Sequence, residues 1–313
     1  MPSNTIAFPR MVKVLGVVCM LAVLTLAGCG GGGSGTTGGS NKPGTGVKVI
    51  VGSKNDPDGQ LLGWMYALLL QNQGYTVTTD IPGGQTNVLD AAIKSGTVDI
   101  YPEFTGTALS LLSLPATQDP QQAYNEVKAA YEQKFQITML NAAFNLNDSY
   151  GLCTSKAIAS QYNLTSLDDL AKVASQLTVA QQQDAAQILT PVEQVYGIHF
   201  KGTTQITEPL SFGAVTSGAA QVNECYTTDP AIVVNNFVLL KDTKNAFPPY
   251  NPAPLVRDQL LTKSPAIKDT LNALESHLTT DKQTALIKQV AIDKQKPQDV
   301  AKTFLQAEGL LPK

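Results

Sequence analysis

The chain has 313 residues, of which 43% are hydrophobic and 15% are charged, and its formal net charge is −3. A chain of this length and apolar content can bury the cores of two lobes, which excludes a largely disordered protein. The net charge is slightly negative and the sequence contains no cluster of basic residues, so a nucleic-acid partner is not expected.

The N-terminal segment, residues 1–28, has the pattern of a signal peptide. Two basic residues precede an apolar run over 14–27 that is too short for a membrane span. The sequence Leu-Ala-Gly-Cys at 26–29 places small residues before a cysteine, as in the lipobox of bacterial lipoproteins. We expect cleavage before Cys29 and its lipidation, which would hold an extracytoplasmic protein at the bacterial cell membrane. An ordinary signal peptide with an incidental cysteine is the alternative.

Residues 29–46 follow as a stretch dominated by glycine, serine and threonine, with few groups that could pack. We expect a flexible tether with a reach of roughly 20–25 Å as a coil. Two of the 22 basic residues and none of the 25 acidic residues lie before it, which leaves the remaining chain with a net charge of about −5.

Two cysteines, Cys153 and Cys225, remain in the part expected to fold. An exported pair favours a disulfide, and two free thiols are the alternative. The histidines, His199 and His277, are isolated, and no Cys-x-x-Cys motif occurs. We therefore expect neither a metal site nor a cofactor.

The first part of the folded chain alternates strand and helix patterns, which predicts an α/β lobe with a mostly parallel sheet covered by helices. The expected strands are 47–51, 75–81, 98–101 and 137–140, and the expected helices are 60–73, 87–94 and 121–135.

A second lobe is expected to begin where residues 149–153 cross from the first. Its expected helices are 156–162, 166–175, 191–196 and 212–217, and its expected strands are 177–180 and 222–226. Beyond Thr228 a strand at 238–241 and the final helices are expected to pack on the first lobe. The prediction is therefore a lobe I of 47–148 plus 229–313 and a lobe II of 149–228, with a cleft between them.

The most informative motif is Asp-Ile-Tyr-Pro-Glu-Phe-Thr-Gly-Thr-Ala-Leu at 99–109. A strand pattern runs into Pro102, which removes a ladder donor, and Thr105-Gly106-Thr107 then offers hydroxyls and free N–H groups at a helix start. Such a turn is suited to holding a small polar ligand.

This motif resembles the strand end of the substrate-binding proteins of ABC importers for quaternary amines, the glycine betaine, choline and carnitine type. The resemblance continues at 52–55, 60, 147–150, 226–229, 247–250 and 300–305. It implies a two-lobed type II periplasmic-binding-protein fold, a small quaternary amine ligand, and delivery of that ligand to an ABC permease. It does not imply an enzyme.

A quaternary ammonium has no N–H to donate, so aromatic faces rather than hydrogen bonds must bind it. The resemblance assigns this role to Phe104, Tyr150, Tyr226 and Tyr250, with Phe104 where the family usually has tyrosine. Each ring taken singly could instead belong to the core or pin a loop. Tyr101 is a neighbour whose direction the strand pattern leaves open.

For the polar end of the ligand, the resemblance implies Lys54 and Thr107, with Gln60 as a further contact. The loop before Gln60 is one residue longer than the usual spacing. The arginine that some family members supply from the second lobe is missing, because arginine occurs only at Arg10 and Arg257. We therefore expect choline or a similar cation to bind at least as well as glycine betaine.

Two other functions remain open from the sequence. The first is a binding protein of the same fold for another small solute, such as an amino acid. The second is an enzyme on this scaffold, although no Ser-His-Asp or Cys-His set is available. The acids Asp99, Glu103 and Asp148 are equally well explained as turn and capping residues.

Overall fold

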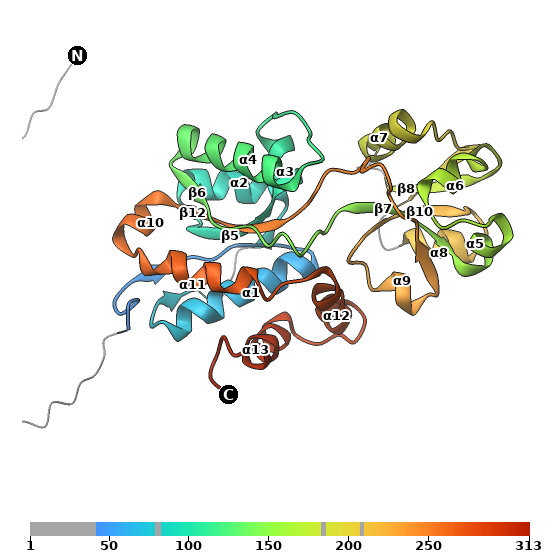
Figure 1. Ribbon diagram of the computed structural model, residues 1–313. Coiled ribbons are helices and arrows are strands. Elements are labelled where there is room, and N and C mark those ends of the chain that lie inside the picture. The colour runs from blue at the N-terminus through green and yellow to red at the C-terminus, as the bar shows by residue number, and fades with distance from the viewer. Residues whose placement is uncertain (1–41, 79–82, 183–185, 207–209) are drawn as a thin grey trace, which may run out of the picture. The chain divides into compact units, whose positions relative to one another are not determined.

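The structure is a computed structural model that describes residues 42–78, 83–182, 186–206 and 210–313 (Figure 1). The expected signal peptide and Cys29 lie outside the described residues. No helix in the described part of the chain is long and apolar enough to cross a membrane.

The described start of the chain, residues 42–46, is a turn rather than the end of a tether. Lys42 Nζ donates to the backbone oxygen of Asn72 at 2.7 Å, and Gly44 N donates to the backbone oxygen of Gln73 at 2.9 Å. Gly44 is buried against Tyr75, where an added Cβ would meet the ring at 2.4 Å. These contacts fasten the chain to the end of the first long helix.

The first lobe contains a three-stranded sheet of order β5-β12-β6 and two short parallel pairs, β1 with β3 and β2 with β4. Its strands are β1 (Lys48–Val49), β2 (Ser53–Lys54), β3 (Thr76–Val77), β4 (Gly83–Gly84), β5 (Ile100–Phe104), β6 (Ile137–Met139) and β12 (Pro252–Arg257). Strand β12 is antiparallel to both of its neighbours. Parallel pairing joins β1 with β3, β2 with β4 and Val51 with Ile100, as expected for a mostly parallel sheet. The departure from this expectation is β12, which returns from the second lobe and separates β5 from β6.

Strand β12 was not predicted because its sequence contains two prolines. Pro252 and Pro254 lie opposite Phe104 and Pro102 in the register. The flanking bonds, from Thr105 N to the oxygen of Asn251 and from Arg257 N to the oxygen of Asp99, place the prolines at pairs that exchange no hydrogen bond. Missing N–H groups therefore cost this ladder nothing.

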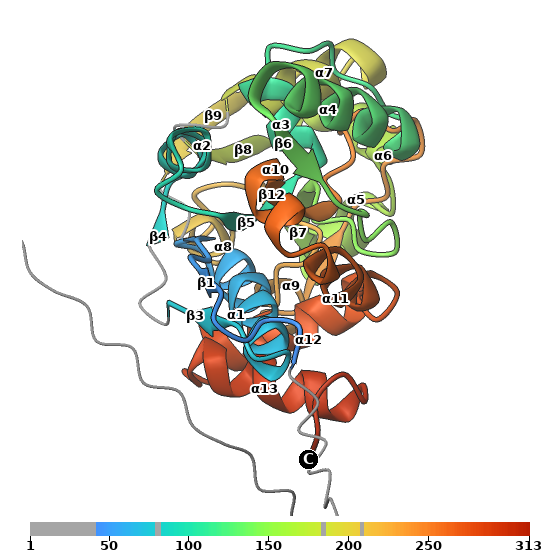
Figure 2. The same ribbon diagram turned by 90° about the vertical axis from the view of Figure 1, so that its left-hand side faces the viewer.

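Helices cover both faces of the first-lobe sheet (Figure 2). They are α1 (Pro57–Asn72), α2 (Thr86–Ser95), α3 (Thr105–Leu111), α4 (Pro120–Phe135), α10 (Asp258–Lys263), α11 (Ala266–Glu275), α12 (Thr280–Ala291) and α13 (Pro297–Ala307). One apolar cluster joins Ile100 and Val256 of the sheet to α1, α11, α12 and α13. A second cluster joins Tyr101 and Leu255, on the opposite face, to α2, α3 and α4.

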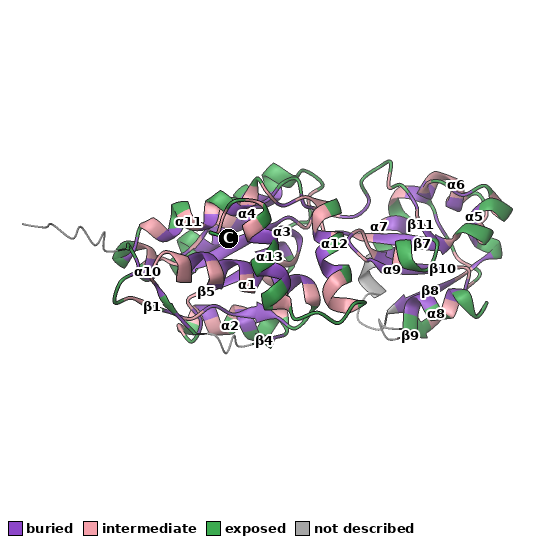
Figure 3. Ribbon diagram, turned by 90° about the horizontal axis from the view of Figure 1, so that it is seen from below, coloured by how far each residue is buried: buried purple, intermediate pink, exposed green. Residues whose placement is uncertain are grey.

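The second lobe is built on a five-stranded sheet of order β11-β7-β10-β8-β9. Its elements are β7 (Tyr150–Ser155), α5 (Lys156–Tyr162), α6 (Leu167–Ala171), η1 (Ala174–Gln176), β8 (Thr178–Gln182), α7 (Ala186–Tyr196), β9 (Gly202–Ile206), α8 (Ser211–Thr216), β10 (Val222–Tyr226), α9 (Ala231–Val234) and β11 (Phe237–Leu239). Strands β8, β9 and β10 are parallel, and β7 runs antiparallel to β10 and β11. Buried residues concentrate on the sheets and on the inner sides of the helices in both lobes (Figure 3).

Strand β11 shows that the chain stays in the second lobe longer than the sequence suggested. Phe237 and Leu239 pair with Ser155 and Cys153 of β7, and Phe247 packs in the apolar cluster of this lobe. The return therefore follows Phe247 and not Thr228. We propose lobe boundaries at two crossings, residues 146–149 and 248–251, which the ribbon shows as two connecting segments (Figure 1).

Candidate functional site

A cavity of about 350 Å³ lies between the two lobes and brings together most of the residues that the sequence singled out. Residues from both lobes and from the crossings line it, namely Lys54, Asp56, Pro57, Asp58, Thr86, Phe104, Thr107, Asp148, Tyr150, Tyr226, Thr228, Asp229, Pro230, Tyr250, Ile287, Ala291 and Ile292. Six of the expected ligand contacts are among them. The seventh, Gln60, is not.

Four aromatic rings at this cavity form what we call the aromatic wall: Phe104, Tyr150, Tyr226 and Tyr250. Tyr150 and Tyr226 are direct partners in the β7–β10 register, so their rings lie on the same face of the sheet, with centroids 4.9 Å apart. Tyr250 meets Tyr150 edge-on, at a centroid distance of 5.3 Å and an interplanar angle of 87°. Phe104 ends β5 and serves as the N-cap residue of α3.

The turn after Phe104 lets Tyr250 approach the start of α3. A Cβ added at Gly106 would lie 2.7 Å from the Tyr250 ring, closer than real side chains allow. Thr105 Oγ1 donates to the backbone oxygen of Pro249 at 3.1 Å and accepts from Asn251 N at the same distance. The Thr-Gly motif therefore fixes the return crossing, while Thr107 is the residue of this turn that lines the cavity.

Hydrogen bonds join the segments next to the aromatic wall. Tyr250 N donates to Asn147 Oδ1 at 2.7 Å, and Asp148 N donates to the backbone oxygen of Tyr250 at 3.0 Å. Thr227 Oγ1 donates to the backbone oxygen of Asn147 at 2.7 Å, and Ser149 Oγ donates to that of Pro248 at 2.8 Å. Both crossings and the end of β10 thus form one bonded unit.

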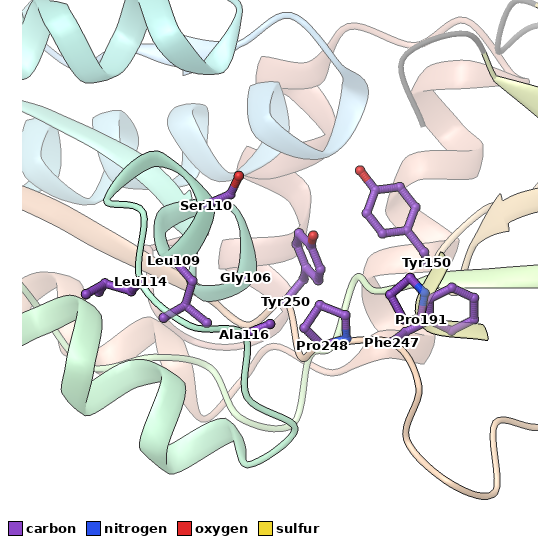
Figure 4. A pocket seen from close by; sticks show the side chains of 10 residues that line it. All are labelled: Gly106, Leu109, Ser110, Leu114, Ala116, Tyr150, Pro191, Phe247, Pro248 and Tyr250. Carbon is purple, nitrogen blue, oxygen red and sulfur yellow. The ribbon is translucent and has the colours of Figure 1, made fainter. Parts of the chain in front are cut away.

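Tyr150 and Tyr250 also border a second cavity, of about 250 Å³ (Figure 4). Its other walls are mostly apolar: Gly106, Leu109, Ser110, Leu114, Ala116, Pro191, Phe247 and Pro248. In the close view Tyr250 lies centrally, between the side chains of α3 and those of the second lobe. The two tyrosines therefore separate an apolar space from the cavity that contains the charged groups.

Lys54 is buried and already has a carboxylate partner. Its Nζ lies 2.6 Å from Glu103 Oε1 and 4.8 Å from the centroid of the Phe104 ring. Glu103 also accepts from Phe104 N at 2.7 Å and from the hydroxyl of Tyr101 at 3.0 Å. Glu103, which the sequence suggested only as a turn or capping residue, therefore holds the lysine. Tyr101 is fully buried and does not line the cavity.

Asp58, and not the expected Gln60 two residues later, lines the cavity. Asp56 caps α1 by accepting from Gly59 N at 2.6 Å, and Pro57 takes the first helical position, so the helix starts before the segment that the sequence assigned to it. This start places Asp58 at the cavity. Gln60 instead donates through Nε2 to the backbone oxygen of Asn55 at 2.8 Å.

Four carboxylates line the cavity, and we call Asp56, Asp58, Asp148 and Asp229 the acidic group. Burial raises the pKa of Asp58 well above its usual range, and the charge of Asp148 raises it further. Loss of hydration raises the pKa of Asp148 to about 7, although the Thr228 hydroxyl, which donates to it, opposes the shift. Burial also raises the pKa of Asp229.

The sequence reasoning missed the acidic group as a feature of the site. Asp148 was noted only as a turn or capping residue, and Asp56 and Asp58 were placed in a loop. The Asp-Pro-Asp sequence just after a short strand was the available signal, because aspartate followed by proline is typical of a helix start.

Cys153 and Cys225 form a disulfide with their Cα atoms 6.0 Å apart. The bond joins β7 to β10 on the sheet face opposite Tyr150 and Tyr226, since side chains alternate along each strand. It therefore ties together the two strands that carry half of the aromatic wall.

Comparison with known proteins identifies the family. A family model described as the substrate-binding domain of an ABC-type glycine betaine transport system matches residues 47–307. The chain belongs to this family. It is accordingly an extracytoplasmic substrate-binding protein of ABC transport and not an enzyme, as the resemblance in the sequence indicated.

Two curated relatives and one solved structure illustrate the match. The carnitine transport binding protein OpuCC of Listeria monocytogenes is 28% identical over 304 residues, covering 95% of this chain and 96% of its own. A glycine-betaine-binding protein of Pseudomonas aeruginosa is 29% identical, covering 83% and 88%. The crystal structure of a glycine betaine/carnitine/choline ABC transporter aligns with a TM-score of 0.74 at 23% identity, covering 84% and 99%. This likeness confirms the two-lobed type II fold.

Proposed function

We propose that this protein captures a quaternary ammonium compound in the cavity between its lobes and delivers it to the permease of an ABC importer. The observation that carries the proposal is the convergence of Phe104, Tyr150, Tyr226 and Tyr250 on one cavity. The names of the relatives, which concern carnitine and glycine betaine, support the same ligand class.

The aromatic wall suits a methylated ammonium for a physical reason. Such a group spreads its charge over methyl groups and donates no hydrogen bond. Ring faces therefore attract it, whereas polar side chains cannot form hydrogen bonds with it. Each desolvated cation–π contact contributes about 2 kcal/mol, so four rings would supply roughly 8 kcal/mol. That total corresponds to micromolar binding.

We further propose that the mature chain begins at a lipidated Cys29, which would keep the binding protein beside its permease. The support is the Leu-Ala-Gly-Cys pattern and the glycine-rich segment behind it. Mass spectrometry of membrane-extracted protein tests this directly. We expect an N-terminal diacylated cysteine, and a mature chain that starts elsewhere or carries an unmodified Cys29 would contradict it.

A thermal-shift screen of the purified protein tests the ligand class. Choline, glycine betaine and carnitine should raise the melting temperature, whereas amino acids without a methylated ammonium should not. A shift produced by amino acids alone would replace the proposal with a same-fold binding protein for another solute. Titration calorimetry of the best compound then gives its affinity.

A further inference from the structure

The cavity contains more carboxyl groups than a zwitterionic ligand requires. Four aspartates line it, and Lys54 is the one basic side chain among its described lining residues. The residues outside the described ranges in this part of the chain, 79–82, 183–185 and 207–209, include no lysine or arginine in the sequence. Arg257 lies elsewhere, with Nη1 3.4 Å from Asp99 Oδ1.

The single lysine is not free to meet a ligand carboxylate. Its Nζ is 2.6 Å from Glu103 Oε1, and neither side chain is more than 9% exposed. A bound carboxylate would have to share this ammonium with Glu103 while facing the acidic group nearby. Like charges in a poorly hydrated site repel strongly, so the arrangement disfavours a second anion.

Two members of the acidic group accept hydrogen bonds at helix starts, and this structural role accounts for their presence at the cavity. Asp56 caps α1, and Asp229 Oδ1 accepts from Ala231 N at the start of α9, at 2.9 Å. Asp58 and Asp148 cap no helix. Among the described residues no set of three or more His, Cys, Asp or Glu side chains is arranged to hold a metal ion, so a metal does not account for them.

Asp58 has an unused acceptor. Its Oδ1 accepts from Gln283 Nε2, whereas its Oδ2 is buried without any hydrogen-bond partner. The residue is only 6% exposed and lines the cavity. A buried carboxylate oxygen without a partner is costly, and a donor on a bound ligand would satisfy it.

We propose that the preferred ligand is a quaternary ammonium monocation that has a hydrogen-bond-donating hydroxyl and no carboxylate, and that Asp58 and Asp148 bind its polar end. The inference rests on the proposed function and narrows its ligand class. Choline is the simplest probe of this chemistry. The ammonium lies against the aromatic wall, the hydroxyl donates to the buried carboxylates, and the acidic group balances the added charge.

Titration calorimetry on the purified full chain tests the proposal, with choline and glycine betaine as paired probes. The parent should bind choline at least about tenfold more tightly than glycine betaine. Asp58→Asn and Asp148→Asn should each weaken choline binding by about tenfold and change glycine betaine binding much less. The ratio of the choline affinity to the glycine betaine affinity should therefore fall in both variants. Asp299→Asn, which also replaces a carboxyl group with an amide but at an exposed position in the first turn of α13, should leave both affinities unchanged.

Three outcomes would overturn the proposal. Tighter binding of glycine betaine than of choline would refute it and leave the quaternary-amine function standing. Asp58→Asn and Asp148→Asn could instead weaken the binding of both ligands equally, at melting temperatures that match the parent. This result would show that the two acids do not discriminate between choline and glycine betaine. If neither compound binds, the proposed function fails as well.

Discussion

The aromatic wall and the acidic group border the same cavity but are held in place by different means. The rings come from strand ends and from the return crossing, where the β7–β10 register, a disulfide and close packing fix them. The carboxylates come from the starts of α1 and α9 and from the first crossing, where hydrogen bonds position them and their ionisation depends on the surroundings. The positions of the rings are thus set by covalent and steric constraints, whereas the charge of the carboxylates is set by electrostatics.

This difference predicts that the two sides respond to different perturbations. Changes to packing should act through the rings and affect every quaternary amine. Changes of charge or of pH should act through the carboxylates, and the size of their effect on affinity should depend on the polar end of the ligand. The experiments below separate the two, and they are arranged from the largest expected change in free energy to the smallest.

Removal of the disulfide should have the largest effect. The bond closes a sequence separation of 72 residues, and such a crosslink contributes about 2–4 kcal/mol to the free energy of unfolding. The double variant Cys153→Ser/Cys225→Ser should therefore lose stability in urea titrations, and reductant should do the same to the parent but not to the variant. Choline affinity should fall several-fold, since the two strands carry Tyr150 and Tyr226. Unchanged unfolding would show that the crosslink does not stabilise this lobe.

Tyr150→Ala should have the next largest effect, because Tyr150 contacts both Tyr226 and Tyr250. Loss of one desolvated ring contact, about 2 kcal/mol, corresponds to roughly 30-fold weaker binding of both choline and glycine betaine. Phe144→Ala, at an exposed ring outside the cavity, is the matched control. Calorimetry that finds parental affinity in a stable Tyr150→Ala protein would remove the aromatic wall from the mechanism.

Choline affinity should rise with pH between 6 and 8. Burial raises the pKa of Asp148 to about 7 in the unligated protein; the Thr228 hydroxyl and Lys54 oppose this shift, and Asp56 and Asp229 add to it. A bound cation favours the ionised carboxylate, so binding releases a proton and strengthens as pH rises through that value. We expect a gain of up to about tenfold over this range.

The control for this pH dependence is Asp148→Asn, which keeps an acceptor for the Thr228 hydroxyl but does not titrate. Its affinity profile should be flatter than that of the parent. Asp58 also faces this site and its pKa is raised, so some dependence should remain in the variant. Identical profiles in calorimetry at pH 6, 7 and 8 would show that Asp148 is not the titrating group.

Gln60→Ala should have the smallest effect, less than about twofold on the affinity for either ligand. The side chain bonds to the backbone oxygen of Asn55 and does not line the cavity. Paired titrations of Gln60→Ala and Asp58→Asn compare two positions on the first turns of α1. A larger loss at Gln60 than at Asp58 would reverse our assignment of the polar contact.

The sequence was a good guide to the aromatic wall for a clear physical reason. Phe104, Tyr150 and Tyr226 sit at the ends of strands whose apolar patterns are easily recognised, and family motifs mark the same positions. Tyr250 follows two prolines in a motif that is equally visible. Residues whose placement depends on local pattern can be predicted from the sequence.

The parts that were missed depend on relations that a linear pattern does not contain. The position of Asp58 follows from a helix that starts at Pro57, three residues before the apolar periodicity becomes clear. Strand β12 keeps its ladder with β5 despite its prolines because of the register between the two strands, and β11 joins the second lobe by pairing with β7. Each of these is a tertiary relation between distant segments.

The hydrogen bonds that join the crossings have a mechanical consequence. When two lobes rotate about a hinge, atoms near the axis move least, and displacement grows with distance from it. Tyr150 and Tyr250 immediately follow or belong to the crossings, and Tyr226 adjoins Thr227, which is bonded to Asn147. These three rings therefore have short lever arms. Tyr150 packs on the second-lobe core and is paired with Tyr226, whereas Tyr250 packs on the first-lobe core together with Phe104. A hinge rotation would therefore move Tyr250 and Phe104 as one pair relative to Tyr150 and Tyr226.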